Sequence, residues 1–461
     1  MPKKITTEQR EQVLSLLAQG HDRHTIAALV GVTPGQVSAV SAHVRMGTYS
    51  LPTLASSAPA TPAIDSAGKG ECQAPESSPP TVRIGDFAPI PLGPDVESGQ
   101  TVFWNPDPET GAANPHVLIL GESGFGKTYT ISCLLAELSQ RGVSSIVFDY
   151  GQGFALDAAP KQFVEWTRPV EVHAARDGID VNPLTIFETD VLGPINVAQR
   201  VADTFCRVYS RLGVQQHAVL RQAVIDSFSN MGIDPANRRT WNQSPPPFRS
   251  VFDTLQSIAS DPLQPQSSIA ASVASHISTM FVFNTFRPTG QHLDWSELLK
   301  LRDRVVILQL KGLEYSLEQA VTEFLLWNLI GYVESKGPSP LRCFVVLDEA
   351  HRMSFDRGTP VEKLLREGRK FGLGLLLASQ QPEDFSPVAF GNTATKVVFQ
   401  ISDDKSAVTR QLHRKLKDGH SFADLFNVVT KLPRGSAYVV SENVGRIVSI
   451  SSFDERHRMF Q

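Results

Sequence analysis

The sequence predicts an α/β protein, with a parallel sheet covered by helices on both faces and a small all-α domain before it. From about residue 82, apolar β-rich runs alternate with amphipathic helical patterns, which is typical of strand-helix-strand units. Residues 7–46 instead show only helical periodicity, and a stretch without periodicity separates the two regions. The length of 461 residues allows two or three domains.

Residues 1–48 are predicted to fold as three short helices, because apolar side chains recur there at helical spacing. The stretch Ile-Ala-Ala-Leu-Val-Gly-Val-Thr at 26–33 resembles a helix-turn-helix, with Thr33 as the cap of the last helix. In that family the last helix enters the major groove of DNA. A helical bundle that contacts another protein is the alternative interpretation. The predicted helices are 8–19, 23–29 and 34–45.

Residues 49–84 are predicted to form a disordered, Pro/Ala/Ser-rich linker. Positions 51–80 contain 6 Pro, 5 Ser and 6 Ala and no aromatic residue. A segment of this composition cannot bury enough apolar surface to fold. The linker would let the N-terminal domain sample a wide volume around the rest of the chain.

The remaining residues, 85–461, are predicted to form one α/β domain. Each of its clearest strands ends at a polar or glycine-rich turn, and ligands bind at the carboxyl ends of such strands. A mostly helical pattern at about 190–285 predicts a helical insertion. Apolar runs at 436–440 and 446–450 predict a hairpin around Asn443. The clearest strands are 117–120, 145–149, 305–310, 344–347 and 373–378.

Composition and charge exclude several classes of protein. Lys and Arg number 43 against 47 Asp and Glu, so no general positive field drives nucleic-acid binding over the whole surface. The four cysteines are far apart, which argues against a zinc site or a disulfide framework and fits a reducing cytoplasm. The start does not have the pattern of a secretory signal, and no apolar run reaches the roughly 20 residues of a membrane-spanning helix. We therefore expect a cytoplasmic protein that does not insert into membranes.

A phosphate-binding motif follows the strand predicted at 117–120. The motif G-x-x-x-x-G-K-[ST] lies between that strand and an amphipathic helix, the context in which it binds nucleotides. Its glycines let backbone N–H groups curl around phosphates, and the helix N-terminus adds a positive dipole. Lys127 would reach the β- and γ-phosphate oxygens, and Thr128 would offer its hydroxyl to Mg²⁺. The motif consists of Gly121, Glu122, Ser123, Gly124, Phe125, Gly126, Lys127 and Thr128.

Two adjacent carboxylates end the strand predicted at 344–347. In this arrangement Asp348 holds Mg²⁺ through its water shell, and Glu349 polarises the water that attacks the γ-phosphate. Together with the phosphate loop, the pair predicts a hydrolysis site that uses ATP and Mg²⁺. The alternative is that the two acids only complement the dipole at a helix N-terminus.

The run Asp-Glu-Ala-His at 348–351 also matches the signature motif of one helicase superfamily. Such helicases would carry a Ser-Ala-Thr turn after the next strand and a second RecA-like lobe. Here the next strand ends in Ala-Ser-Gln-Gln at 378–381, and no second lobe is evident. We therefore do not expect a helicase of that superfamily.

Several runs resemble the HerA/FtsK superfamily of ring-forming DNA pumps, which includes the HerA and conjugation-coupling branches. Leu-Leu-Arg-Glu-Gly-Arg-Lys-Phe-Gly at 364–372 is followed by an apolar strand and by Ser-Gln-Gln-Pro at 379–382. Segments 89–93, 102–106 and 148–154 are similar to that superfamily as well. The resemblance implies a RecA-like P-loop ATPase domain.

The resemblance also implies two further site residues. Gln380 matches the polar residue that senses the γ-phosphate and passes its loss to the rest of the subunit. Arg369 matches the candidate arginine finger, which reaches into the neighbouring subunit's nucleotide and neutralises charge in the transition state. Arg366 is the alternative finger, and a solvated helix end is the alternative interpretation of these arginines.

A ring-forming DNA translocase is the function that the resemblance implies. It would be a homo-oligomer, a hexamer, that hydrolyses ATP at subunit interfaces and passes DNA through its centre. A separate nuclease would be its partner where DNA is cut, in DNA processing or phage defence. Two other functions stay open: a helix-turn-helix DNA-binding regulator with an ATPase switch, and a conjugation or secretion motor.

Overall fold

The structure, a computed structural model, divides the chain into two compact units, Met1–Pro80 and Thr81–Gln461. The predicted linker at 49–84 lies outside the described residues. The structure describes residues 6–18, 23–45, 88–107, 113–287, 293–300, 303–380, 385, 387–402, 406–416 and 421–459.

The N-terminal unit contains the three predicted helices, which pack around the buried side chains of Val13, Ile26 and Val37. Thr33 caps the last of them, because Gln36 N donates to Thr33 Oγ1 at 3.3 Å and Thr33 N donates to Gln36 Oε1 at 2.8 Å. The helices are confirmed, whereas a DNA-binding role for them stays a prediction. They are α1 Thr7–Ala18, α2 Arg23–Val30 and α3 Pro34–Arg45.

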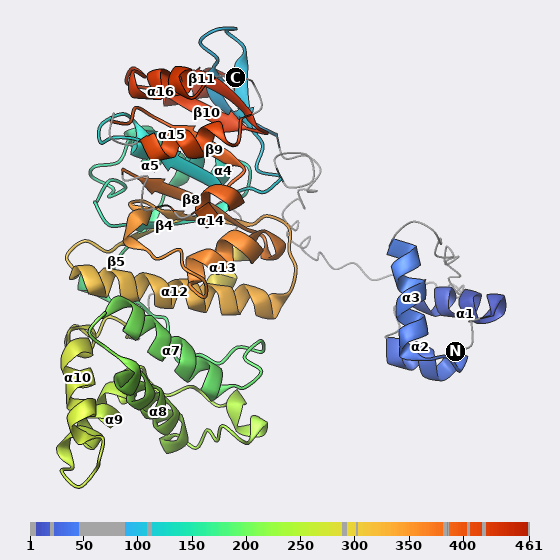
Figure 1. Cartoon of the computed structure of the whole chain (residues 1–461), viewed down its shortest axis with the longest axis vertical. Coiled ribbons are helices and arrows are strands. Elements are labelled where there is room, and N and C mark those ends of the chain that lie inside the picture. The colour runs from blue at the N-terminus through green and yellow to red at the C-terminus, as the bar shows by residue number, and fades with distance from the viewer. Residues whose placement is uncertain are drawn as a thin grey trace, which may run out of the picture. The chain divides into compact units, whose positions relative to one another are not determined.

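A sheet of nine strands within the described residues forms the centre of the main unit (Figure 1). The strand order is β11-β10-β9-β3-β8-β7-β4-β6-β5, and the strands from β9 to β5 run parallel. β10 pairs antiparallel with β9 and β11. The strands are β3 Val117–Leu120, β4 Ser144–Asp149, β5 Val170–His173, β6 Val305–Gln309, β7 Cys343–Leu347, β8 Leu373–Ser379, β9 Thr395–Val398, β10 Ser436–Ser441 and β11 Val444–Ser449.

Both faces of the sheet are buried along its central strands, β3, β4, β6, β7, β8 and β9. Ile119 of β3 packs with α4 (Lys127–Gln140) on one face, and Leu118 packs with α12 (Tyr315–Lys336) on the other. Strands covered on both faces read as continuous apolar runs, which is why the sequence pattern locates them. The predicted α/β fold with a largely parallel sheet is confirmed.

Helices α7 to α10 lie between β5 and β6, where the sequence predicts a helical insertion. In Figure 1 they gather at one end of the main unit, and α7 packs against α12. Aromatic side chains join the insertion to the core: the ring centroid of Phe248 lies 5.3 Å from that of Phe324 on α12. The helices are α7 Pro194–Val208, α8 Val214–Asn230, α9 Arg249–Ser260 and α10 Ser267–Val282.

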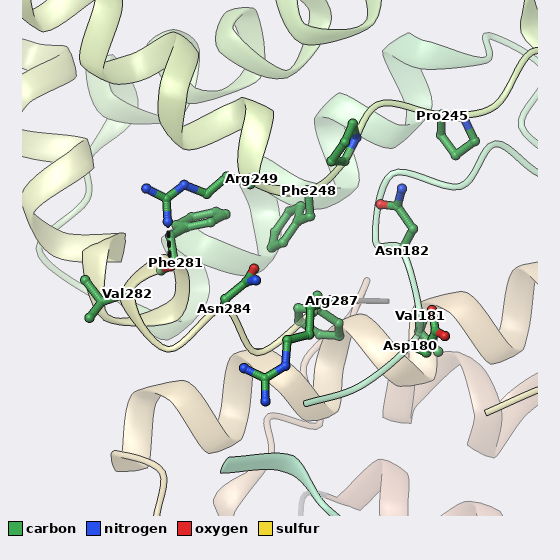
Figure 2. A pocket seen from close by; sticks show the side chains of 12 residues that line it. Asp180, Val181, Asn182, Pro245, Phe248, Arg249, Phe281, Val282, Asn284 and Arg287 are labelled. Carbon is green, nitrogen blue, oxygen red and sulfur yellow. Dashed lines mark hydrogen bonds between the residues drawn. The ribbon is translucent and has the colours of Figure 1, made fainter. Parts of the chain in front are cut away.

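A cavity of about 550 Å³ lies where the insertion joins the sheet (Figure 2). Residues 180–182 lead from the sheet into the insertion and residues 284–287 lead back, and both segments contribute to the lining. Arg249 Nη1, at the same cavity, donates to the carbonyl of Phe281 at 2.8 Å. None of the residues predicted for the nucleotide site lines this cavity.

The C-terminal hairpin is confirmed. Glu442 and Asn443 join β10 to β11 with φ angles of 51° and 67°, as a two-residue hairpin turn of type I′ requires. Across the described ranges, no helix combines the length and the apolar character needed to cross a bilayer. The other elements are β1 Ile90–Pro94, β2 Thr101–Trp104, α5 Lys161–Thr167, α6 Ala174–Asp177, η2 Arg238–Asn242, α11 Trp295–Lys300, η3 Ala350–Arg352, α13 Pro360–Glu367, η4 Gly368–Phe371, α14 Pro387–Asn392, α15 Ser406–His413, α16 Phe422–Thr430 and α17 Phe453–Met459.

Candidate nucleotide-binding site

The phosphate loop connects β3 to α4, and its backbone requires glycine. Gly121 and Gly126 have φ angles of 144° and 113°, which L side chains rarely adopt. A Cβ on Gly121 would also stand 2.5 Å from Cβ of Phe399. Glu122 donates its N–H to the carbonyl of Gln400 at 2.9 Å. The residues that follow β9 therefore hold the loop in place.

Lys127 is the first residue of α4, and its side chain folds back over the loop. The residue is 7% exposed, and Nζ donates to the carbonyls of Gly121 and Glu122, each at 2.8 Å. The N-terminus of α4 adds the positive end of a helix dipole at the same place. Positive charge is thus concentrated where the sequence predicts phosphate.

Asp348, Glu349 and Gln380 meet at the carboxyl edge of the sheet. β8 lies between β3 and β7, so the ends of these three parallel strands are neighbours. Lys127 is close enough to Asp348 for its charge to act on the carboxyl group. The structure therefore brings the predicted loop, the two acids and the predicted sensor together at one edge.

Glu349 is held by two neighbouring side chains. Its φ angle is 64°, a left-handed value that is uncommon outside glycine. Gln380 Nε2 donates to Glu349 Oε1 at 2.5 Å, and His351 Nδ1 lies 3.2 Å from Glu349 Oε2. The same His351 nitrogen lies 3.1 Å from the hydroxyl of Ser379. Both carboxylate oxygens of Glu349 are therefore positioned, and His351 is a contact that the sequence does not predict.

Asp348 is buried, and its pKa is raised to about 7. Burial is the largest cause, and the negative charges of Glu349 and Asp149 add to it. The positive charge of Lys127 acts in the opposite direction. A cation bound beside Asp348 would favour its ionised form.

Oxygens of Thr128 and Asp348 both lie near Gly153. The point where a Cβ on Gly153 would stand is 3.8 Å from Thr128 Oγ1 and 3.7 Å from Asp348 Oδ2. Mg²⁺ prefers oxygen ligands and takes few of them from the protein, because it keeps several waters and binds phosphate oxygens. A hydroxyl and a carboxylate at this place therefore fit Mg²⁺ bound together with a nucleotide.

Asp149, at the end of β4, orders the turn that carries Gly153. Its Oδ1 accepts from Gly153 N at 3.2 Å, and its Oδ2 accepts from Phe154 N at 2.8 Å and from Gln309 Nε2 at 2.9 Å. The sequence motifs alone predict no role for Asp149. A buried Asp directly before a turn with two glycines is the signal that could have identified it.

Arg369 lies away from the phosphate loop of its own chain. It belongs to η4, just before β8, and its Nη1 donates to the carbonyl of Ala113, just before β3. The 4 residues of β3, a length of about 13 Å, separate that edge of the sheet from the phosphate loop. Arg366, the alternative finger, pairs with Glu362 on α13. The structure thus does not bring Arg369 to the site of its own subunit.

Comparisons with known proteins find relatives of similar sequence and fold. The family model described as "Helicase HerA, central domain" matches residues 111–329. The DNA double-strand break repair helicase HerA of Saccharolobus solfataricus is 22% identical over 359 residues, which cover 74% of this chain and 64% of the relative. This chain thus spans less than two thirds of that relative's length.

Solved structures share the fold. VirB4 of Thermoanaerobacter pseudethanolicus matches with a TM-score of 0.64 and 18% identity, over 81% of this chain and 98% of that one. The plasmid coupling protein TrwB, in a complex with ADP and Mg²⁺, matches with a TM-score of 0.51 and 14% identity, over 74% of this chain and 86% of that one. The predicted P-loop fold and the predicted resemblance are confirmed.

Proposed function

We propose that the main unit of this chain, which is similar to the HerA/FtsK superfamily of P-loop proteins, is an ATP-driven motor that moves DNA. One observation carries the proposal: Gln380 contacts Glu349, the neighbour in sequence of the Asp348 carboxyl on which the charge of Lys127 acts, in a domain similar to a DNA repair helicase. A base in contact with a γ-phosphate sensor, at the same edge of the sheet as a phosphate loop, provides the parts that hydrolysis needs.

Each side chain has a separate task in this proposal. Lys127 exchanges its two carbonyl contacts for phosphate oxygens, and Glu349 accepts the proton of the attacking water. Thr128 and Asp348 would hold Mg²⁺, which neutralises phosphate charge when bound. Whether the hydrogen bond from Gln380 to Glu349 is kept or broken would depend on whether a γ-phosphate is present. Loss of the γ-phosphate would thereby be transmitted to β8, the strand that Gln380 follows.

Binding of Mg²⁺ is expected to weaken as the pH falls. Because the pKa of Asp348 is about 7, a proton competes with the cation below neutral pH. The Mg²⁺ concentration at half-saturation should rise about eightfold between pH 7.5 and pH 6.0, if one proton is displaced. The measurement is a Mg²⁺ titration of the thermal unfolding midpoint with a non-hydrolysable ATP analogue. The Asp348→Asn variant should bind Mg²⁺ more weakly and lose this pH dependence. If the variant kept the same pH dependence, the proton that competes with Mg²⁺ would belong to a group other than Asp348.

A second copy of the chain is proposed to complete the site, within a hexameric ring. Arg369 is exposed at the amino edge of the sheet, away from its own phosphate loop. Across a subunit interface, its planar guanidinium would stabilise the charge that develops on the neighbour's phosphates. This separation of Arg369 from its own site supports the proposed interface.

DNA is proposed to pass through the centre of the ring, and the N-terminal helices would recruit the ring to DNA or to a protein partner. The cap formed by Thr33 and Gln36 fixes the start of α3, the helix that would enter a major groove. A separate nuclease would cut DNA where cutting is required. We place the protein in the cytoplasm, in line with its scattered cysteines.

The stimulation of ATP hydrolysis by duplex DNA tests the proposed function. A motor that tracks the backbone should be stimulated severalfold by duplexes of unrelated sequence, because phosphate contacts carry no sequence information. The Lys127→Ala variant should be inactive with and without DNA. A flat response to every duplex would contradict the motor, and a response to one sequence alone would favour a DNA-binding regulator. If the ring bound a membrane partner and its rate of ATP hydrolysis did not change with DNA, a secretion motor would be favoured.

A further inference from the structure

The turn between α16 and β10 packs against the phosphate loop of the same chain. Gly435 N donates to the carbonyl of Phe125 at 3.4 Å. The guanidinium carbon of Arg434 lies 6.0 Å from the centroid of the Phe125 ring. A Cβ on Gly124 would stand 3.3 Å from Arg434 Nη2. The guanidinium group therefore lies directly against the middle of the loop.

Arg434 is an exposed cation with unused donors at this position. Within the described part of the chain, its guanidinium makes neither an ion pair nor a hydrogen bond. A guanidinium presents five N–H donors in a planar arrangement that matches phosphate oxygens. Lys127, by contrast, contacts the start of the loop through the carbonyls of Gly121 and Glu122. Two cations from distant parts of the chain thus approach different parts of one loop.

We propose that Arg434 binds phosphate oxygens of the nucleotide held by its own subunit, as a second cation beside Lys127. The inference rests on the proposed function, because it presumes that the loop binds a nucleoside phosphate. It assigns Arg434 to the same subunit, whereas Arg369 is assigned to the neighbour's site. Because Arg434 comes two residues before β10, the contact would also tie the nucleotide to the C-terminal hairpin.

Nucleotide affinity tests the contact. In the Arg434→Ala variant, the dissociation constant of a fluorescent ATP analogue should rise about tenfold, which is the loss of one charge-assisted hydrogen bond. The dissociation constant of Arg434→Lys should lie between those of Arg434→Ala and the wild type, because an ammonium group keeps the charge but not the planar donors. Lys431→Ala, an exposed cation of the same connection, is the matched control and should bind as the wild type does.

The outcomes separate this inference from the proposed function. Wild-type affinity in Arg434→Ala, with binding lost in Lys127→Ala, would overturn the role of Arg434 and leave the nucleotide site in place. A wild-type chain that binds no nucleotide would overturn the proposed function itself. Equal losses in Arg434→Ala and Lys431→Ala would reduce the effect to general surface charge and would also overturn the inference.

A mixing experiment tests whether Arg434 acts within its own subunit. Arg434→Ala subunits mixed with Glu349→Gln subunits, at ATP concentrations below the wild-type KM, should give only the sum of the two separate activities. Arg434 and Glu349 would both act in the site of the subunit that carries them. Every site in the mixture would therefore lack one of these two residues. Activity above that sum would place Arg434 in the neighbour's site and would contradict the assignment.

Discussion

The Glu349→Gln variant is expected to bind ATP and to hydrolyse it about 10²–10⁴-fold more slowly than the wild-type chain. The amide has the shape of the carboxylate but cannot accept the proton of the attacking water. The contact with Gln380 can persist, because an amide oxygen accepts a hydrogen bond as a carboxylate oxygen does. Binding and hydrolysis should therefore separate in this variant.

Two measurements on the Glu349→Gln variant are needed: the steady-state rate of phosphate release, and the ATP that stays bound after gel filtration. Glu367→Gln is the matched control, since Glu367 is an exposed carboxylate at the end of α13. The control should keep the wild-type rate. Undiminished turnover in Glu349→Gln would show that another group activates the water.

The Arg369→Ala variant is expected to hydrolyse ATP about 10³–10⁵-fold more slowly than the wild type, which is the factor that arginine fingers contribute to turnover. Its affinity for ATP should stay close to that of the wild type, because an arginine finger acts on the charge that develops in the transition state and Arg369 lies away from the phosphate loop of its own subunit. The variant thus differs from Arg434→Ala, in which affinity is expected to fall.

Two neighbouring cations are the controls for Arg369. Arg366→Ala removes an arginine that already pairs with Glu362, and Lys370→Ala removes an exposed ammonium next to Arg369. Both variants should keep most of the wild-type turnover. If Arg366→Ala lost turnover and Arg369→Ala kept it, the finger would be Arg366.

The parts of the fold that the sequence predicts are those with a local signal. The central strands are apolar throughout because both faces are buried, and the hairpin is marked by Asn443 at a left-handed position. β5 and β9 were missed. β5 is only partly buried, and β9 contains Lys396, whose burial lowers its pKa to about 8. Neither strand shows the apolar pattern that identifies the others.

The candidate site was predictable where its residues are neighbours in sequence. The phosphate loop and the pair Asp348 and Glu349 follow directly from strand-end motifs. The contacts of Asp149 with Gln309 and of Arg434 with the loop depend on tertiary packing. No periodicity or spacing in the chain reports such contacts, so the structure was needed to find them.

The most direct test of the account is a mixture of two inactive variants, Arg369→Ala and Glu349→Gln. The central claim is that one subunit supplies Lys127 and Glu349 and the next supplies Arg369. A mixture should then contain interfaces at which an Arg369→Ala subunit, with its intact base, receives Arg369 from a Glu349→Gln neighbour. We expect ATP turnover well above the sum of the separate variants, with a maximum at intermediate ratios. Turnover that never exceeds that sum at any ratio would contradict a site shared between two copies of the chain.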